Sequence, residues 1–332
     1  MKIFFARLRT ADWKFGGLTF LAPIVVIIVF SFFDLGDDYR SVMPRKLSLV
    51  DMANDNKIFV GDIAARLRFS VASAGLSIAS FVVIVVSSFY FSTYVFRTWF
   101  YGPILVISVA GVAGFLGWWS VQWSGDFRHL VADCGRRGLE DCPLDRVAAA
   151  GSPLSKGALE GAQAIVSANW AAGLGAASVL FCLFLVLAVS GPSDLRPCGL
   201  RRRRRWFMAS LIMASVLLSF SVGATRGFYT WSSIFHTKDD AAGLLSLADS
   251  VGIYWGSMFT ATILLTGGAA AAGIMNDIHR VGSGETGTNQ EYVEWLKREG
   301  LDSQPLQAIL AIIVAAGPLL SPPALNFITG TG

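Results

Sequence analysis

The stretch FSVASAGLSIASFVVIVVSSFYFSTYVF, residues 69–96, contains no Asp, Glu, Lys, Arg or His. A helix needs about 20 mostly apolar residues to cross the hydrocarbon core of a bilayer, which is about 30 Å thick. This stretch is longer than that, and its apolar residues do not alternate with polar ones as they do in the strands of a membrane barrel. It therefore predicts a membrane-spanning α-helix.

Five further stretches meet the same criterion, and each also lacks ionisable side chains. They are Phe15–Phe33, Tyr101–Trp123, Ile165–Ser190, Trp206–Thr225 and Val251–Met275. Aromatic residues gather near their ends, as is typical of membrane–water interfaces. The chain is 54% hydrophobic and 15% charged, whereas a soluble domain carries about 25% charged residues. We therefore predict an all-α polytopic membrane bundle with six spans between residues 15 and 275.

The loop 191–205 decides the expected orientation, because basic residues in short loops concentrate on the cytoplasmic side. It carries Arg196 and the run Arg201, Arg202, Arg203, Arg204 and Arg205. We expect this loop and the N-terminal residues 1–14 to be cytoplasmic in a cell inner membrane, and the loops 34–68, 124–164 and 226–250 to lie outside. The run itself has three interpretations: a topology determinant, a contact for anionic lipid headgroups, or a docking site for an acidic partner.

Two cysteines bear on the same orientation. Cys134 and Cys142 lie in the second outer loop, where an oxidising compartment would let them pair. We predict a disulfide between them. The alternative is two free thiols on the reducing side, which would invert the orientation.

The residues after the sixth span divide into two parts. Residues 276–305 are expected to form a cytoplasmic linker with a short helix from about Asn289 to Glu299, because Thr288 and Glu291 have the spacing of a capping box and Gly300 is a natural stop. Residues 306–332 form a hydrophobic tail broken by prolines. We favour a re-entrant or interfacial segment over a seventh span for this tail.

No pattern predicts a catalytic, cofactor or metal site. Residues 282–287 fit G-x-G-x-x-G, but a dinucleotide-binding turn follows a strand, whereas a membrane helix precedes this segment, so we interpret it as a flexible linker. The three histidines, His129, His236 and His279, cannot supply paired haem ligands at membrane depth. The ion-free spans also disfavour proton-coupled transport, and no feature predicts nucleic-acid binding.

Serines on the second span form the one periodic polar pattern. Ser70, Ser73, Ser77, Ser80 and Ser87 follow helical spacing and are expected on one face. Such a face lines a pore or packs closely against another helix, since small and hydroxylated residues mark helix interfaces in lipid. We favour packing.

The leading functional hypothesis is a non-catalytic integral subunit or scaffold of a larger inner-membrane complex, with other membrane subunits or further copies of the chain as partners. One alternative is a channel or facilitator that uses the serine face. Another is a membrane enzyme that acts on lipid headgroups through loop residues such as His129, His236 and Asp239.

Overall fold

The computed structural model describes residues 13–31, 56–96, 100–123, 156–189, 195–233 and 238–301. These residues form seven α-helices and one π-helical segment, without a strand among them. The elements are α2 (Trp13–Ser31), α4 (Asn56–Tyr90), η2 (Phe91–Phe96), α5 (Tyr101–Trp123), α8 (Lys156–Ala188), α9 (Pro197–Ser233), α10 (Lys238–Glu285) and α11 (Asn289–Arg298). The predicted all-α membrane bundle is thereby confirmed for this part of the chain.

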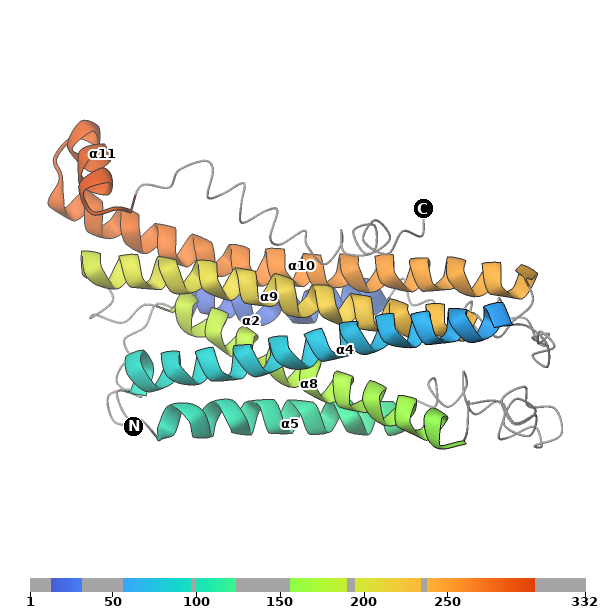
Figure 1. The fold of residues 1–332 in the computed structure, drawn as a ribbon. Coiled ribbons are helices and arrows are strands. Elements are labelled where there is room, and N and C mark those ends of the chain that lie inside the picture. The colour runs from blue at the N-terminus through green and yellow to red at the C-terminus, as the bar shows by residue number, and fades with distance from the viewer. Residues whose placement is uncertain are drawn as a thin grey trace.

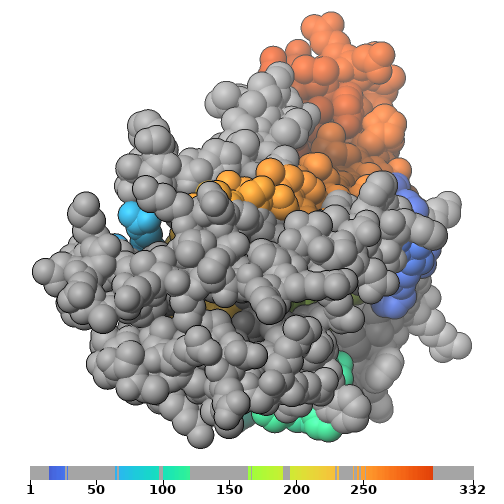
Figure 2. All heavy atoms as spheres, turned by 90° about the vertical axis from the view of Figure 1, so that its right-hand side faces the viewer, coloured from blue at the N-terminus to red at the C-terminus, as the bar shows by residue number. Residues whose placement is uncertain are grey.

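The long helices lie side by side along one direction, and α11 stands at one end (Figure 1). The most extensive contact joins α9 and α10, while α8 touches α2, α4, α5, α9 and α10 and so lies centrally. α5 forms one edge of the bundle against α8 and α4, and α2 forms another against α10 and α8. Figure 2, which looks along the bundle from the other end, shows α11 projecting beside α10.

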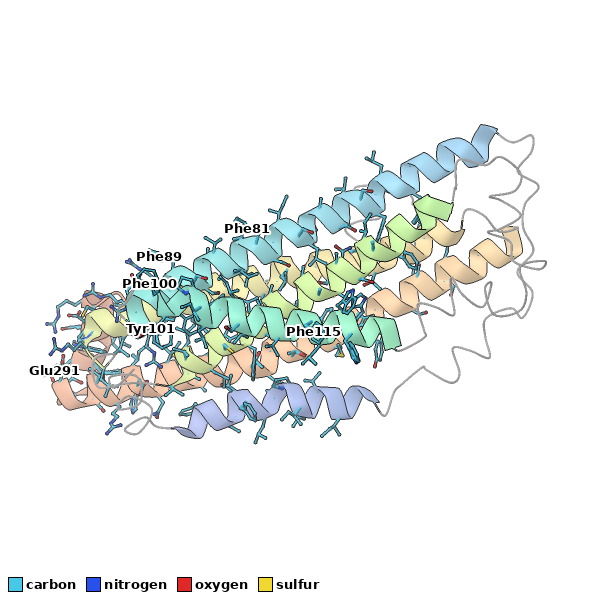
Figure 3. The ribbon with its side chains drawn as sticks, turned by 90° about the horizontal axis from the view of Figure 1, so that it is seen from below. Phe81, Phe89, Phe100, Tyr101, Phe115 and Glu291 are labelled. Atoms are coloured by element: carbon cyan, nitrogen blue, oxygen red, sulfur yellow. The ribbon has the colours of Figure 1, made fainter. Side chains whose placement is uncertain are left out.

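The surface of the bundle is apolar, as hydrocarbon surroundings require. Phe81 and Phe89 on α4 point away from the bundle (Figure 3), and these two residues and Phe115 on α5 are 67%, 51% and 56% exposed. Among the described residues, five helices, α4, α5, α8, α9 and α10, are long and apolar enough to cross a membrane. α2 contributes the shorter apolar stretch Phe15–Val26, so the sixth span stays a prediction.

Several helices run well past the apolar stretches. α10 has 48 residues, which corresponds to about 72 Å at 1.5 Å per residue. Most of the predicted outer loop 226–250 is therefore helical, and α4 already begins at Asn56 inside the predicted loop 34–68. α9 begins at Pro197, a favoured first helical residue, so the arginine run lies on a helix and not in a loop. Once a helix is nucleated, each further residue adds a hydrogen bond, so it continues until a breaker stops it.

One end of the bundle gathers the arginine run, and we call it the arginine end. The ring of Tyr90, at the end of α4, lies 4.9 Å from that of Trp206 on α9. A Cβ on Gly273 of α10 would meet Phe15 of α2 and the carbonyl of Ala188 at the end of α8. α2, α5 and α9 thus start where α4, α8 and α10 end, as the predicted alternation of spans requires. The side of the membrane that this end faces stays a prediction.

Other predicted features lie outside the described residues. These are Cys134 and Cys142 with most of the loop 124–164, His129, His236, residues 1–12 and the hydrophobic tail 306–332.

Candidate functional site

The five arginines cannot act as one charged face. Consecutive residues on an α-helix point about 100° apart, so a helical run of five radiates around the axis of α9. Each guanidinium therefore meets different surroundings, and four of the five contact groups within the chain.

Arg203 points inward and is buried. Its side chain is 3% exposed, and its Nη1 lies 2.6 Å from Oδ2 of Asp277 on α10, whose side chain is 7% exposed. Its Nη2 donates to the carbonyl of Leu187, 2.5 Å away, in the last turn of α8. The last carbonyls of a helix have no partner within it and carry the negative end of its dipole. One guanidinium thus joins the ends of α8, α9 and α10, although its Nε has no partner among the described residues.

Arg201 and Arg204 hold the end of α11. Arg201 lies 3.3 Å from a carboxylate oxygen of Glu299, and Nη1 of Arg204 donates to the carbonyl of Gly300 at 3.3 Å. Both acceptors stand at the C-terminal end of α11, where cations are favoured by the helix dipole. The arginine run therefore fixes α11 to the bundle.

Arg202 and Arg205 point to other sides of α9. The guanidinium carbon of Arg202 lies 4.6 Å from the ring centre of Tyr94, a cation–π contact. Tyr94 belongs to η2 and contacts the rings of Tyr90 and Trp206. Arg205 is exposed and has no hydrogen bond, ion pair or ring contact with the described residues. The predicted lipid or partner contact of the whole run stays a prediction, and Arg205 is the member that remains available for it.

The corner between α10 and α11 is tightly packed. Thr288 and Glu291 form the expected capping box, and Gly300, with φ of 59°, follows α11 as its stop. The indole Nε1 of Trp295, a residue 2% exposed, donates to Glu285 at 2.7 Å. Any Cβ on Gly282 would collide with the rings of Tyr292 and Trp295. The interpretation of this segment as a flexible linker does not hold for residues 282–285, because they belong to α10 and Gly282 lets two aromatic rings approach.

Tyr292 also has an altered acidity at this corner. Burial raises the pKa of its phenol above the ordinary value of 10.0, since the anion is less well solvated there. His279 of α10 contacts its ring edge to face, with ring centres 5.6 Å apart. His279 is exposed near the end of α10, and its ring takes part in this packing.

The five serines of α4 do not share one environment. Ser73, Ser80 and Ser87, spaced by seven residues, are buried, whereas Ser70 and Ser77 are exposed. The hydroxyl of Ser73 accepts a 2.8 Å hydrogen bond from Nδ2 of Asn169 on α8. Those of Ser80 and Ser87 have no partner among the described residues. The predicted single face is therefore restricted to three serines, which lie at the contacts of α4 with other helices.

An open groove of about 480 Å³ lies between α4 and α5. Its floor is formed by small residues of α8, and its walls by Ile84 of α4 and by residues of α5. The lining residues on α5 and α8 are Ile107, Ala110, Gly111, Gly114, Phe115, Trp118, Ala171, Ala172 and Gly175. α4 and α5 diverge from their junction and α8 crosses between them (Figure 1). The groove is open to the surface of the bundle.

The glycines at this groove differ in what they do for the fold. A Cβ on Gly114 would lie 2.9 Å from the carbonyl oxygen of Ala171, and one on Gly175 would lie 2.8 Å from that of Ala110. These two glycines therefore let α5 and α8 approach. A Cβ on Gly111 would meet nothing within 4 Å, so no contact among the described residues explains this glycine.

Sequence reasoning missed the Arg203–Asp277 pair and the groove. The spans were delimited by the absence of charge, at Trp206 and Met275, so both charged residues fell just outside them. A signal was present, because the two residues have opposite charge and lie within one turn of span ends on the same predicted side. The groove has no comparable signal, since it depends on how α4, α5 and α8 cross.

Comparisons with models of protein families, with curated proteins and with solved structures found no match to this chain. The functional proposals therefore depend on the geometry of the chain itself.

Proposed function

We propose that this chain is a non-catalytic integral membrane subunit, a scaffold that holds a transmembrane helix of another protein in the groove between α4 and α5. The observation that carries the proposal is Gly111, a glycine in the middle of a membrane helix that faces an open groove and not its own bundle. A cell inner membrane, with the arginine end cytoplasmic, is the location that the basic residues favour.

The chemistry of the groove suits a helix. Helices in lipid associate through van der Waals contact, and small residues let their backbones approach. The floor at Ala171, Ala172 and Gly175 and the wall at Ala110 and Gly111 are all small. Larger side chains flank them, at Ile107, Phe115 and Trp118, as the ridges beside a docked helix would require.

Gly111 lowers the stability of α5 unless it allows a close contact with another helix. A glycine inside a helix destabilises it by about 1 kcal/mol relative to alanine. Gly114 and Gly175 offset this loss through the close approach of α5 to α8. Gly111 has no such contact among the described residues, and a partner helix would supply one.

The other end of the molecule fits a scaffold. Arg203 joins three helix ends, and Arg201 and Arg204 fix α11. These contacts hold α8, the floor of the groove, in a defined position relative to α9 and α10. A docking surface formed in advance loses less conformational freedom on binding.

The test is site-specific photo-crosslinking in native membranes. A photoreactive residue at Ile107, in the groove, is expected to give one discrete adduct. One at Val112, which is 63% exposed on the same helix but outside the groove lining, is expected to give none. The adduct should disappear with Gly111→Leu, which fills the groove, and persist with Gly268→Leu, a matched change at an open position on α10.

The outcomes separate the proposal from its rivals. An adduct of twice 35.7 kDa would mean that a second copy fills the groove. The absence of an adduct at Ile107, or an adduct unaffected by Gly111→Leu, would contradict helix docking at this place.

A second candidate is a channel or facilitator, favoured by the buried hydroxyls of Ser80 and Ser87 on α4. Both lack a partner among the described residues, whereas Ser88 and Ser210 bond the carbonyl four residues earlier. Unpaired hydroxyls inside a bundle are suited to hold water. Proteoliposomes that show neither solute flux nor conductance, with or without Ser80→Ala, would exclude this role.

A further inference from the structure

We propose that the outer face of α9 binds an anionic phospholipid, with the phosphate at Arg205 and an acyl chain along Ile212, Val216 and Phe220. The inference is independent of the helix-docking groove, which lies on α4, α5 and α8.

These residues share one face of α9. Steps of seven and four residues return a helix to nearly the same side, and Arg205, Ile212, Val216 and Phe220 follow steps of seven, four and four. All of them are exposed, the three apolar ones at 46%, 44% and 37%, and the ring of Phe220 also packs over Gly75 of α4. The face therefore consists of a cation followed by an unbroken apolar strip.

The length of this strip matches one leaflet. Arg205 and Phe220 are 15 residues apart on one helix, which corresponds to about 22 Å along its axis. Half of a bilayer, headgroups included, is about 20–22 Å thick. A phosphate at Arg205 thus places the end of the acyl chain near Phe220.

Charge complementarity selects an anionic headgroup. Two carboxylates of the described residues pair with the run, Asp277 with Arg203 and Glu299 with Arg201, and Glu299 also pairs with Arg298. Arg205 has no ion pair with a described residue, and Arg201, one turn away on α9 and 44% exposed, adds to the positive potential. Trp206 follows Arg205, and indole rings prefer the headgroup region.

The experiment measures lipid binding to the purified full chain in detergent by native mass spectrometry. Phosphatidylglycerol is compared with phosphatidylcholine of the same acyl chains, and inorganic phosphate is added at millimolar concentration as a competitor. Arg205→Gln is the test variant. Arg298→Gln is the matched control, because it removes the same charge from a side chain that is 72% exposed on α11. Thermal unfolding confirms that both variants fold.

We expect the wild type to bind phosphatidylglycerol more tightly than phosphatidylcholine, and inorganic phosphate not to displace it. Arg205→Gln should weaken phosphatidylglycerol binding about fivefold, which corresponds to ~1 kcal/mol for one interfacial cation, and Arg298→Gln should leave it unchanged. Equal binding of the two lipids, equal losses in the two variants, or displacement by inorganic phosphate would each overturn the proposal.

Discussion

Asp277 and Arg203 form an ion pair that water barely reaches, with side chains 7% and 3% exposed and 2.6 Å between the charged atoms. Removing one partner leaves the other charge buried without compensation, which costs about 3–5 kcal/mol. We therefore expect Asp277→Asn to lower the stability of the purified protein by an amount of this order. Thermal or denaturant unfolding in detergent measures the loss.

The chain provides a matched control for this prediction. Arg226 and Asp249 are also 2.6 Å apart, but the side chain of Asp249 is 53% exposed. Exposed pairs contribute about 0–1 kcal/mol, and this pair is more open to water than Arg203–Asp277, since the side chain of Arg226 is 14% exposed and its carboxylate partner more than half exposed. Asp249→Asn should therefore have a smaller effect than Asp277→Asn, and equal losses in the two variants would show that burial does not set the strength of the Arg203–Asp277 pair.

Tyr292 makes the α10–α11 corner sensitive to alkali. Burial raises its pKa in the folded chain above 10.0, so the folded state holds the phenolic proton more tightly than the unfolded state does. The resulting stabilisation is complete below the unfolded pKa and is lost as pH rises through the folded pKa. We expect the phenolate absorbance assigned to Tyr292, obtained by subtracting Tyr292→Phe from the wild type, to appear above pH 10. Titration of this difference at or below pH 10 would contradict the prediction.

At the scale of elements, the contact of α5 with α8 depends on two glycines that face carbonyl oxygens. Gly175→Ala would place a Cβ 2.8 Å from the oxygen of Ala110, which forces the helices apart. Overpacking of this kind costs about 1–3 kcal/mol, and unfolding in detergent should show it. Gly111→Ala meets open space and should be neutral or raise the stability, because alanine is the better helix former. A larger loss for Gly111→Ala than for Gly175→Ala would contradict this account of the interface.

The helix α11, the arginines of α9 and the segment η2 differ in how far the sequence could predict them. The capping box at Thr288 and the stop at Gly300 are local signals, so the bounds of α11 followed from the sequence within about a residue. The contacts of the individual arginines could not be predicted from the sequence, because they depend on where α9 begins, at Pro197, and on which helices surround it. The π-helical segment η2 has no sequence signature either, and the packing of Tyr90 and Tyr94 against Trp206 beside it depends on how α4 meets α9.

At the scale of the molecule, hydropathy was sufficient to predict the class of fold and to predict which helix ends lie at the same end of the bundle. It could not predict the Arg203–Asp277 pair, because a search for uncharged stretches ends at the first charge, even when that charge is buried. It also could not show which of the five serines of α4 are covered by other helices. Helical spacing groups Ser70 and Ser77 with Ser73, but only the crossing of α4 over other helices decides which of them are covered.

The orientation of the whole molecule can be tested with one native thiol. Cys198 is free and exposed at the arginine end, three residues before the run begins. In a variant that keeps it as the only cysteine, we expect a membrane-impermeant maleimide to leave it unlabelled in spheroplasts and to label it after permeabilisation. Ala242→Cys, added to a cysteine-free chain at an exposed position near the start of α10, should react in both cases. Labelling of Cys198 in sealed spheroplasts would place the arginine end outside. It would also move Cys134 and Cys142 to the reducing side, where a stable disulfide is not expected.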